Sequence, residues 1–136
     1  AGKVLADLLC QIIIEKKLSI DCICYVPISK DSLKKRGFNQ CSVLAKNISS
    51  ILDIPVIDCL VKVKETKEQK LLGKEERMKN ILDAFEIKNK EKLFKKNILL
   101  IDDVYTTGAT INECKKNIEK CNINKIYLLT IAKSNI

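Results

Sequence analysis

Apolar positions along the chain recur with two different periods, and these predict strands that alternate with helices. A spacing of three to four residues through 3–17, 39–52 and 109–121 predicts three amphipathic helices. Continuous apolar runs predict strands over 20–28, 56–63, 84–87, 97–104 and 126–132. Strands that alternate with helices favour a parallel, twisted sheet with helices on both faces, so the predicted fold class is α/β.

The first strands and the polar segment that follows them suggest how the chain is organised. Strand 20–28, helix 39–52 and strand 56–63 form a βαβ unit, whose two strands are expected to run parallel with a right-handed crossover. Segment 64–83 is the most polar part and is too long for an ordinary connection. It is either a flexible functional loop, closed as a hairpin by strand 84–87, or a solvated linker with a short surface helix.

Length and composition favour a single folded domain over the whole chain, 1–136. Of the 136 residues, 46% are hydrophobic, which is enough for a core and argues against global disorder. The longest apolar stretch, 8–14, is interrupted by Gln11, so no membrane span or signal peptide is expected. The sequence starts at Ala1 inside a helical pattern, which predicts that its N-terminus is a cut boundary.

Charge and cysteine usage narrow the function classes. The net charge of +8 favours anionic partners such as nucleotides, diphosphates or nucleic acid, although Lys-rich surfaces also serve solubility alone. Histidine is absent, which excludes His-based acid–base catalysis and His-ligated zinc. The seven cysteines contain no C-x-x-C pair and are expected to be small buried hydrophobes in a reducing, cytoplasmic environment.

Segment 97–110 carries the clearest chemistry. Its apolar start predicts a buried strand, and Asp102 and Asp103 follow at the carboxyl end, where α/β sheets bind ligands. Residues 106–110 enter the next helix, where free N–H groups favour an anion and Gly108 permits close approach. Paired carboxylates accept hydrogen bonds from a diol, so the predicted ligand is a sugar phosphate. A plain strand–turn–helix, or the acid pair of a receiver-type domain, are the alternatives.

The run Ile-Asp-Asp-Val-Tyr-Thr-Thr-Gly-Ala-Thr resembles the phosphoribosyl-diphosphate (PRPP) motif of type I phosphoribosyltransferases. The resemblance implies that Asp102 and Asp103 hold the ribose hydroxyls. It also implies a loop around the 5′-phosphate, formed by Thr106, Thr107, Gly108, Ala109 and Thr110. Mg²⁺ is the expected cofactor, bridging diphosphate oxygens while the two acids hold its waters.

Two other segments complete the site that this resemblance implies. The diphosphate loop would consist of Pro27, Ile28, Ser29 and Lys30, after the first strand. Segment 64–83 occupies the position of the family's flexible hood loop, and closure would exclude water. Lys64 and Arg77 within it, with Lys67 and Lys70, are candidate cations for the leaving diphosphate, although for any single one of them a solvated surface charge is the favoured interpretation.

A more specific resemblance covers nearly the whole chain. The ComF/GntX family, associated with bacterial competence and DNA uptake, is matched by Val26-Pro27-Ile28, Lys35-Arg36-Gly37-Phe38-Asn39-Gln40, Lys64-x-Thr66, Gln69, Leu72, Arg77, Asn80 and Ala84-Phe85. The family's Cys-rich zinc-binding segment has no counterpart here, and Asp83 and Tyr105 depart from its pattern. Arg36 and Gln40 are either a polar clamp on a ligand or part of a helix-entry loop hinged at Gly37.

Two functions from different classes follow. The first is an enzyme of nucleotide metabolism that uses PRPP and Mg²⁺ to transfer phosphoribosyl to an unknown nitrogenous acceptor and releases diphosphate. The second is a non-catalytic PRPP-sensing or DNA-associated module that works with competence proteins. Only three Tyr and three Phe are present, so surfaces for stacking a base are scarce, which keeps the second alternative open. The oligomeric state is open, with a homodimer as one alternative.

Overall fold

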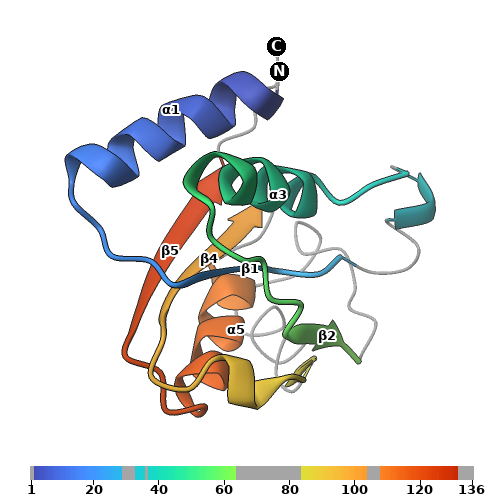
Figure 1. Cartoon of the computed structure of the whole chain (residues 1–136). Coiled ribbons are helices and arrows are strands. Elements are labelled where there is room, and N and C mark those ends of the chain that lie inside the picture. Colours follow the sequence, from blue (N-terminus) through green and yellow to red (C-terminus); the bar gives the residue numbers. More distant parts are fainter. Residues whose placement is uncertain (1, 29–32, 36, 64–83, 104–107, 132–136) are drawn as a thin grey trace.

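The computed structural model describes residues 2–28, 33–35, 37–63, 84–103 and 108–131 of the chain, arranged as an α/β fold (Figure 1). In chain order its elements are α1 (Gly2–Glu15), β1 (Cys22–Tyr25), α3 (Gln40–Leu52), β2 (Leu60–Lys62), β3 (Phe85–Ile87), the 3-10 turn η2 (Lys90–Lys92), β4 (Asn97–Asp103), α5 (Ala109–Glu119) and β5 (Lys125–Ile131). The predicted alternation of strands and helices is confirmed.

A parallel sheet lies at the centre, with its strands in the order β1-β4-β5. Tyr25 is in register with Ile101, and Asp102 is in register with Thr130, so all three strands end at the same edge. On the outer side of β1, Val56 forms a parallel bridge with Ile23. β1 and β4 therefore occupy the middle of the sheet.

The predicted strand 56–63 is interrupted, and the parallel pairing expected for it is wrong in its second half. Only the stretch around Val56 lies parallel to β1, whereas Leu60–Lys62 pairs antiparallel with β3. The chain changes sheets at Asp58, whose backbone oxygen and carboxylate bind residues beyond β3. The hairpin predicted between the two flanks of segment 64–83 is confirmed, and the loop itself lies outside the described residues.

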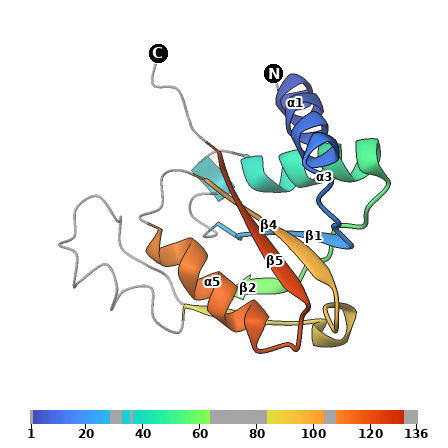
Figure 2. The ribbon, with the colours of Figure 1, turned by 90° about the vertical axis from the view of Figure 1, so that its left-hand side faces the viewer.

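Helices cover both faces of the sheet, as predicted (Figure 2). Side chains alternate along the strands, so Ile23, Leu99 and Ile101 pack in the cluster that contains buried residues of α1 and α3. On the opposite face, Ile98 and Leu100 pack with α5 and the hairpin. Because Ile98, Leu99, Leu100 and Ile101 are all buried, whichever face of the sheet they point to, the apolar run in β4 shows no alternation of polar and apolar residues.

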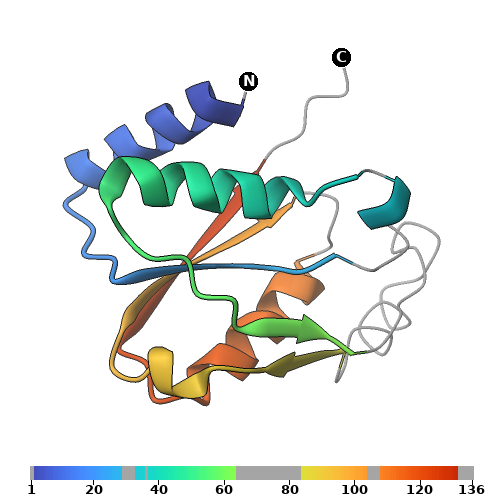
Figure 3. The ribbon, with the colours of Figure 1, turned by 45° about the vertical axis from the view of Figure 1, so that its right-hand side comes forward.

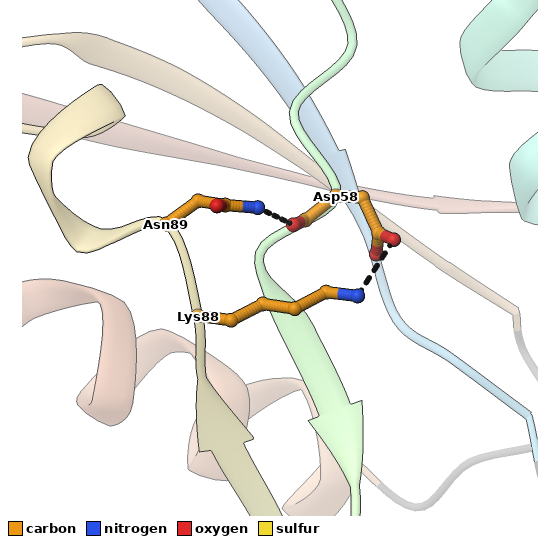
Figure 4. Close-up of polar contacts among 3 residues, drawn as sticks. All are labelled: Asp58, Lys88 and Asn89. Atoms are coloured by element: carbon orange, nitrogen blue, oxygen red, sulfur yellow. Dashed lines mark hydrogen bonds and ion pairs between the residues drawn. The ribbon is translucent and has the colours of Figure 1, made fainter.

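Polar contacts close the base of the hairpin (Figure 4). Lys88 Nζ lies 2.9 Å from Asp58 Oδ2, and Asn89 Nδ2 donates to the Asp58 backbone oxygen at 2.8 Å. Asn89 adopts a left-handed conformation with φ 58°, which turns the chain into η2. An exposed ion pair of this kind contributes at most about 1 kcal/mol, so these contacts chiefly fix where the hairpin closes.

The cysteines are free thiols, and all are buried except the half-buried Cys121. Cys121 lies beyond the end of α5, because this helix ends at Glu119 and not at the predicted residue 121. Hydrogen bonds with the thiols of Cys22 and Cys59, and then burial, raise the pKa of Cys24, whose Sγ lies 3.2 Å from the Sγ of Cys59. The buried cysteines act as small core side chains, as predicted. In the part of the chain that the structure describes, no helix is both long and apolar enough to cross a membrane.

Candidate functional site

The candidate site lies where the carboxyl ends of β1 and β4 meet. From β1 the chain crosses through α3 to Val56 on one side, and from β4 it crosses through α5 to β5 on the other. In open α/β sheets such a reversal leaves a crevice outside the strand ends, where ligands bind. Figure 3 shows the ends of β1 and β4 together with the beginnings of α3 and α5 on the right-hand side of the molecule.

Two buried polar side chains mark this edge. Among the described residues, the polar or charged side chains classed as buried are those of Asp102, 2% exposed, and Thr110, 6% exposed. Asp102 lies at the end of β4 and Thr110 in the first turn of α5, so they flank the turn between strand and helix. Burial of polar groups costs free energy unless they have partners. Their concentration at this turn distinguishes it from the apolar remainder of the core.

The start of α5 is arranged to receive an anion. Its N-cap is Gly108, in the left-handed conformation with φ 78°, and a glycine has no side chain to accept hydrogen bonds from the first turn. A Cβ added at Gly108 would meet nothing within 4 Å, so there is open space beside the backbone. Unshared N–H groups and the helix dipole make such a terminus favourable for a phosphate.

The start of α3 is tied to the end of β1 through Asn39. Its Oδ1 accepts a hydrogen bond from the Cys41 N–H at 3.0 Å, and its Nδ2 donates to the Val26 backbone oxygen at 3.3 Å. Val26 in turn donates to the Ile101 oxygen at 2.9 Å. Asn39 was expected only as a helix start, yet an Asn directly before an apolar helical pattern is an N-cap signal. No sequence pattern predicts the hydrogen bond from Asn39 to Val26, which lies thirteen residues away.

Asp102 affects the pKa of a thiol in the neighbouring helix α5. Burial raises the pKa of the Cys114 thiol in α5, and the Asp102 carboxylate raises it further. Lys62, on β2, acts in the opposite direction on the same thiol. The carboxylate at the end of β4 and the cation on the hairpin therefore act in opposite directions on the pKa of one buried thiol of α5.

The structure brings together six of the predicted site residues. They are Pro27, Ile28, Gln40, Asp102, Gly108 and Thr110, at the ends of β1 and β4 and the starts of α3 and α5. Outside the described residues lie Ser29, Lys30, Arg36, Lys64, Arg77, Thr106 and Thr107. Asp103 and Ala109 are described in their backbone only. Within the described ranges no group of three or more His, Cys, Asp or Glu side chains could hold a metal ion.

Comparison with known proteins gives one family and several relatives. The sequence model of the family described as "Phosphoribosyl transferase domain" matches residues 39–136. Competence protein F of Haemophilus influenzae is 34% identical over 111 residues, which is 80% of this chain and 48% of that protein. Competence protein ComFC of Streptococcus pneumoniae is 34% identical over 108 residues, 79% of this chain and 46% of that protein. The chain thus spans about half the length of these relatives.

A solved structure supports the fold independently. Adenine phosphoribosyltransferase from Leishmania donovani superposes with a TM-score of 0.58, covering 96% of this chain and 52% of that chain, at 17% identity. At this identity the likeness concerns the fold alone. It confirms the predicted type I phosphoribosyltransferase-like arrangement of the sheet and helices.

Proposed function

Because this chain belongs to the phosphoribosyl transferase domain family, and within it to the ComF group, we propose that it binds PRPP with Mg²⁺ at the carboxyl edge of β1 and β4. The bound PRPP would donate its phosphoribosyl group to a nitrogenous acceptor and release diphosphate. One observation carries the proposal. The buried polar side chains Asp102 and Thr110 flank a glycine-capped helix start at the point where the strand order reverses.

Each part of the edge suits one part of PRPP. Asp102 and Asp103 would accept hydrogen bonds from the two ribose hydroxyls, and the first turn of α5 would bind the 5′-phosphate with residues 106–110. The segment that leaves β1 at Val26, which Asn39 holds, would present residues 27–30 to the diphosphate. These roles agree with the resemblance of 101–110 to the PRPP motif.

The transfer breaks the bond between ribose C1 and the diphosphate oxygen and forms a bond from C1 to the acceptor nitrogen, which loses a proton. Positive charge develops on the ring while negative charge builds on the diphosphate. Mg²⁺ keeps several waters and prefers oxygen ligands, so it fits a site where two carboxylates bind its waters and the diphosphate supplies the rest. When bound, it would neutralise the leaving group. Lys64 and Arg77 are the proposed protein cations for the same charge.

Calorimetric titration with PRPP and Mg²⁺ tests the binding step. Asp103→Asn removes one charge-assisted hydrogen-bond acceptor, so we expect affinity to fall by about tenfold or more. Asp7→Asn makes the same substitution at an exposed position on α1 and should leave affinity unchanged. Equal affinity of wild type and Asp103→Asn would show that the site is misassigned.

A separate assay tests the chemistry. The purified protein, PRPP and Mg²⁺ are mixed with a panel of bases, amines and ammonia, and diphosphate release is measured. Release with one acceptor, lost in Asp103→Asn, supports the transferase. PRPP binding without release across the whole panel would favour a PRPP-sensing module instead.

The names of the relatives favour a second candidate function, in bacterial competence. Two proteins that are 34% identical to this chain are named competence proteins. We propose that the PRPP-binding domain contributes to DNA uptake, either by contacting DNA or by sensing PRPP for other competence proteins. The net charge of +8 supports contact with a polyanion. Binding of labelled single-stranded DNA should then weaken steeply between low and physiological salt, and absence of binding at low salt would exclude the DNA version.

A further inference from the structure

Among the described residues, β3 pairs with another strand, β2, on one side only. In an antiparallel pair, residues alternate between those that bond to the partner strand and those that point away from it. The Lys88 N–H donates to the Cys59 oxygen at 2.8 Å, so Lys88 belongs to a bonded pair. By this alternation, Phe85 and Ile87 direct their N–H and C=O groups away from β2. The described part of the two-stranded sheet ends at this edge of β3.

A groove runs between this edge and the C-terminal half of α5. It has a volume of about 520 Å³. One wall consists of β3 and η2 residues and the other of α5 and the turn after it: Phe85, Glu86, Ile87 and Lys90, then Asn117, Lys120 and Cys121. The distance from Thr110 to Asn117 along the helix axis is roughly 10 Å. The groove is therefore separate from the proposed PRPP site, although one helix carries both.

The chemistry of the groove is apolar at its base and positive at its rim. Phe85 and Ile87 belong to the apolar cluster under α5, whereas Lys90 and Lys120 are exposed. Burial raises the pKa of Cys121, and the Lys90 ammonium opposes this shift. Lys90 itself lines the groove. Among the described lining residues Glu86 is the single acid, so the two lysines give this part of the lining a net positive charge.

We propose that the groove binds an extended, acidic segment of a protein partner, which adds to β3 as a further strand. The N–H and C=O groups of Ile87, which is half-buried and directs them away from β2, would bond to its backbone, whereas Phe85 is buried and contributes its ring to the base of the groove. Alternate side chains of the segment would face the apolar base, and its carboxylates would pair with Lys90 and Lys120. Apolar and acidic residues in alternation are therefore the pattern that this groove recognises.

Fluorescence anisotropy with a synthetic peptide tests the proposal. The probe is a capped, labelled peptide of alternating Val and Glu, titrated with the whole protein at low and physiological salt. Methylating alternate backbone nitrogens of the peptide removes its strand hydrogen bonds, so we expect affinity to fall about tenfold or more. Reversing two rim charges in Lys90→Glu/Lys120→Glu should weaken the unmodified peptide by a similar factor, about tenfold.

Controls separate this groove from other basic surfaces. Lys46→Glu reverses an exposed charge on α3, on the opposite face of the sheet, and should bind the peptide like wild type. A peptide of alternating Val and Lys should not bind. The Lys90→Glu/Lys120→Glu protein should keep the PRPP affinity of wild type, so failure here and failure of the PRPP site give different results.

Three outcomes would overturn the proposal. Equal affinity of the methylated peptide would show attraction by charge alone, and this comparison on wild type holds even if the double variant fails to fold. Absence of binding at low salt would show that the edge is closed to strands. Self-association of the protein that blocks the peptide, seen by size-exclusion chromatography, would assign the edge to a second copy of the chain.

Discussion

The helices α3 and α5 begin at the same edge of the sheet, yet they differ in how their first turns are capped. At α3, Asn39 caps the helix with its Oδ1 and binds Val26 with its Nδ2, so a side chain of the protein itself accepts a hydrogen bond from the first turn, at the Cys41 N–H. At α5, the cap is Gly108, which has no side chain and has open space where a Cβ would lie. Both helices follow a central strand, so topology alone does not account for the difference.

This difference distinguishes a helix start that has a structural role from one that is suited to bind a ligand. A terminus that is capped internally has no need of an anion, whereas one with unshared N–H groups gains from binding it. The buried Asp102 and Thr110 lie on the α5 side of this comparison. We infer that α3 holds the end of β1 in place and that α5 binds the phosphate.

The largest effect is expected from Gly108→Ala, measured by calorimetry with PRPP and Mg²⁺. The residue has φ 78°, which an alanine adopts only with strain, so the first turn would shift. Misaligning two charge-assisted hydrogen bonds costs about 3 kcal/mol, which corresponds to a loss of affinity of about a hundredfold.

Gly37→Ala is the matched control for that experiment. Gly37 has the same φ of 78°, and its added Cβ would also meet nothing within 4 Å. Both substitutions should lower the free energy of unfolding by about 1 kcal/mol, but only Gly108→Ala should lose PRPP affinity. An equal loss of PRPP affinity in the two variants would show that the start of α5 has no special role in binding PRPP.

The next effect concerns the stability of the α3 start. Asn39→Ala removes the cap and the bond to Val26, so we expect the free energy of unfolding, measured in urea, to fall by about 2 kcal/mol. Asn39→Asp keeps an oxygen acceptor for the cap but loses the donor to Val26, so about half of that loss should remain. If Asn39→Asp is as destabilised as Asn39→Ala, the tie to β1 dominates and the cap contributes little.

The smallest effect at neutral pH comes from the thiol beneath α5. The pKa of Cys114 is raised above its ordinary value of 9.0 in the folded protein, so the unfolded chain releases this proton first as pH rises. The stabilising contribution is complete below pH 9 and is lost above it, by about 1.4 kcal/mol per pH unit for one thiol. Unfolding in urea between pH 8 and pH 10 should show a shallower decline for Cys114→Ser.

A decline as steep as in wild type would show that other groups cause it. Burial also raises the pKa of Cys10 and Cys121, so part of the decline must remain in the variant. A comparison of the two proteins near pH 7.5 separates the cost of the substitution itself from the effect of ionisation.

Local patterns predicted most elements because periodicity and turn residues act over a few positions. The helices, the β4 run and the hairpin around segment 64–83 were all expected, with ends that moved by a few residues. The strand over 56–63 was only half right, since its halves pair with different partners. An apolar run predicts a strand but does not predict which strand it will pair with. The contacts of Asp58 where the chain changes sheets are with residues 88 and 89, which lie far along the sequence.

The candidate site, with the ligand class that we propose for it, could be predicted from residues 101–110 because strand end, acid pair, glycine and helix start are neighbours in the chain. Other features depend on residues far apart in sequence: the bond from Asn39 to Val26, the reversal of strand order between β1 and β4, and the groove between β3 and α5. The sequence determines local motifs, because their residues are neighbours in the chain. The tertiary structure decides which distant residues come into contact, because packing depends on the free energy of the whole core.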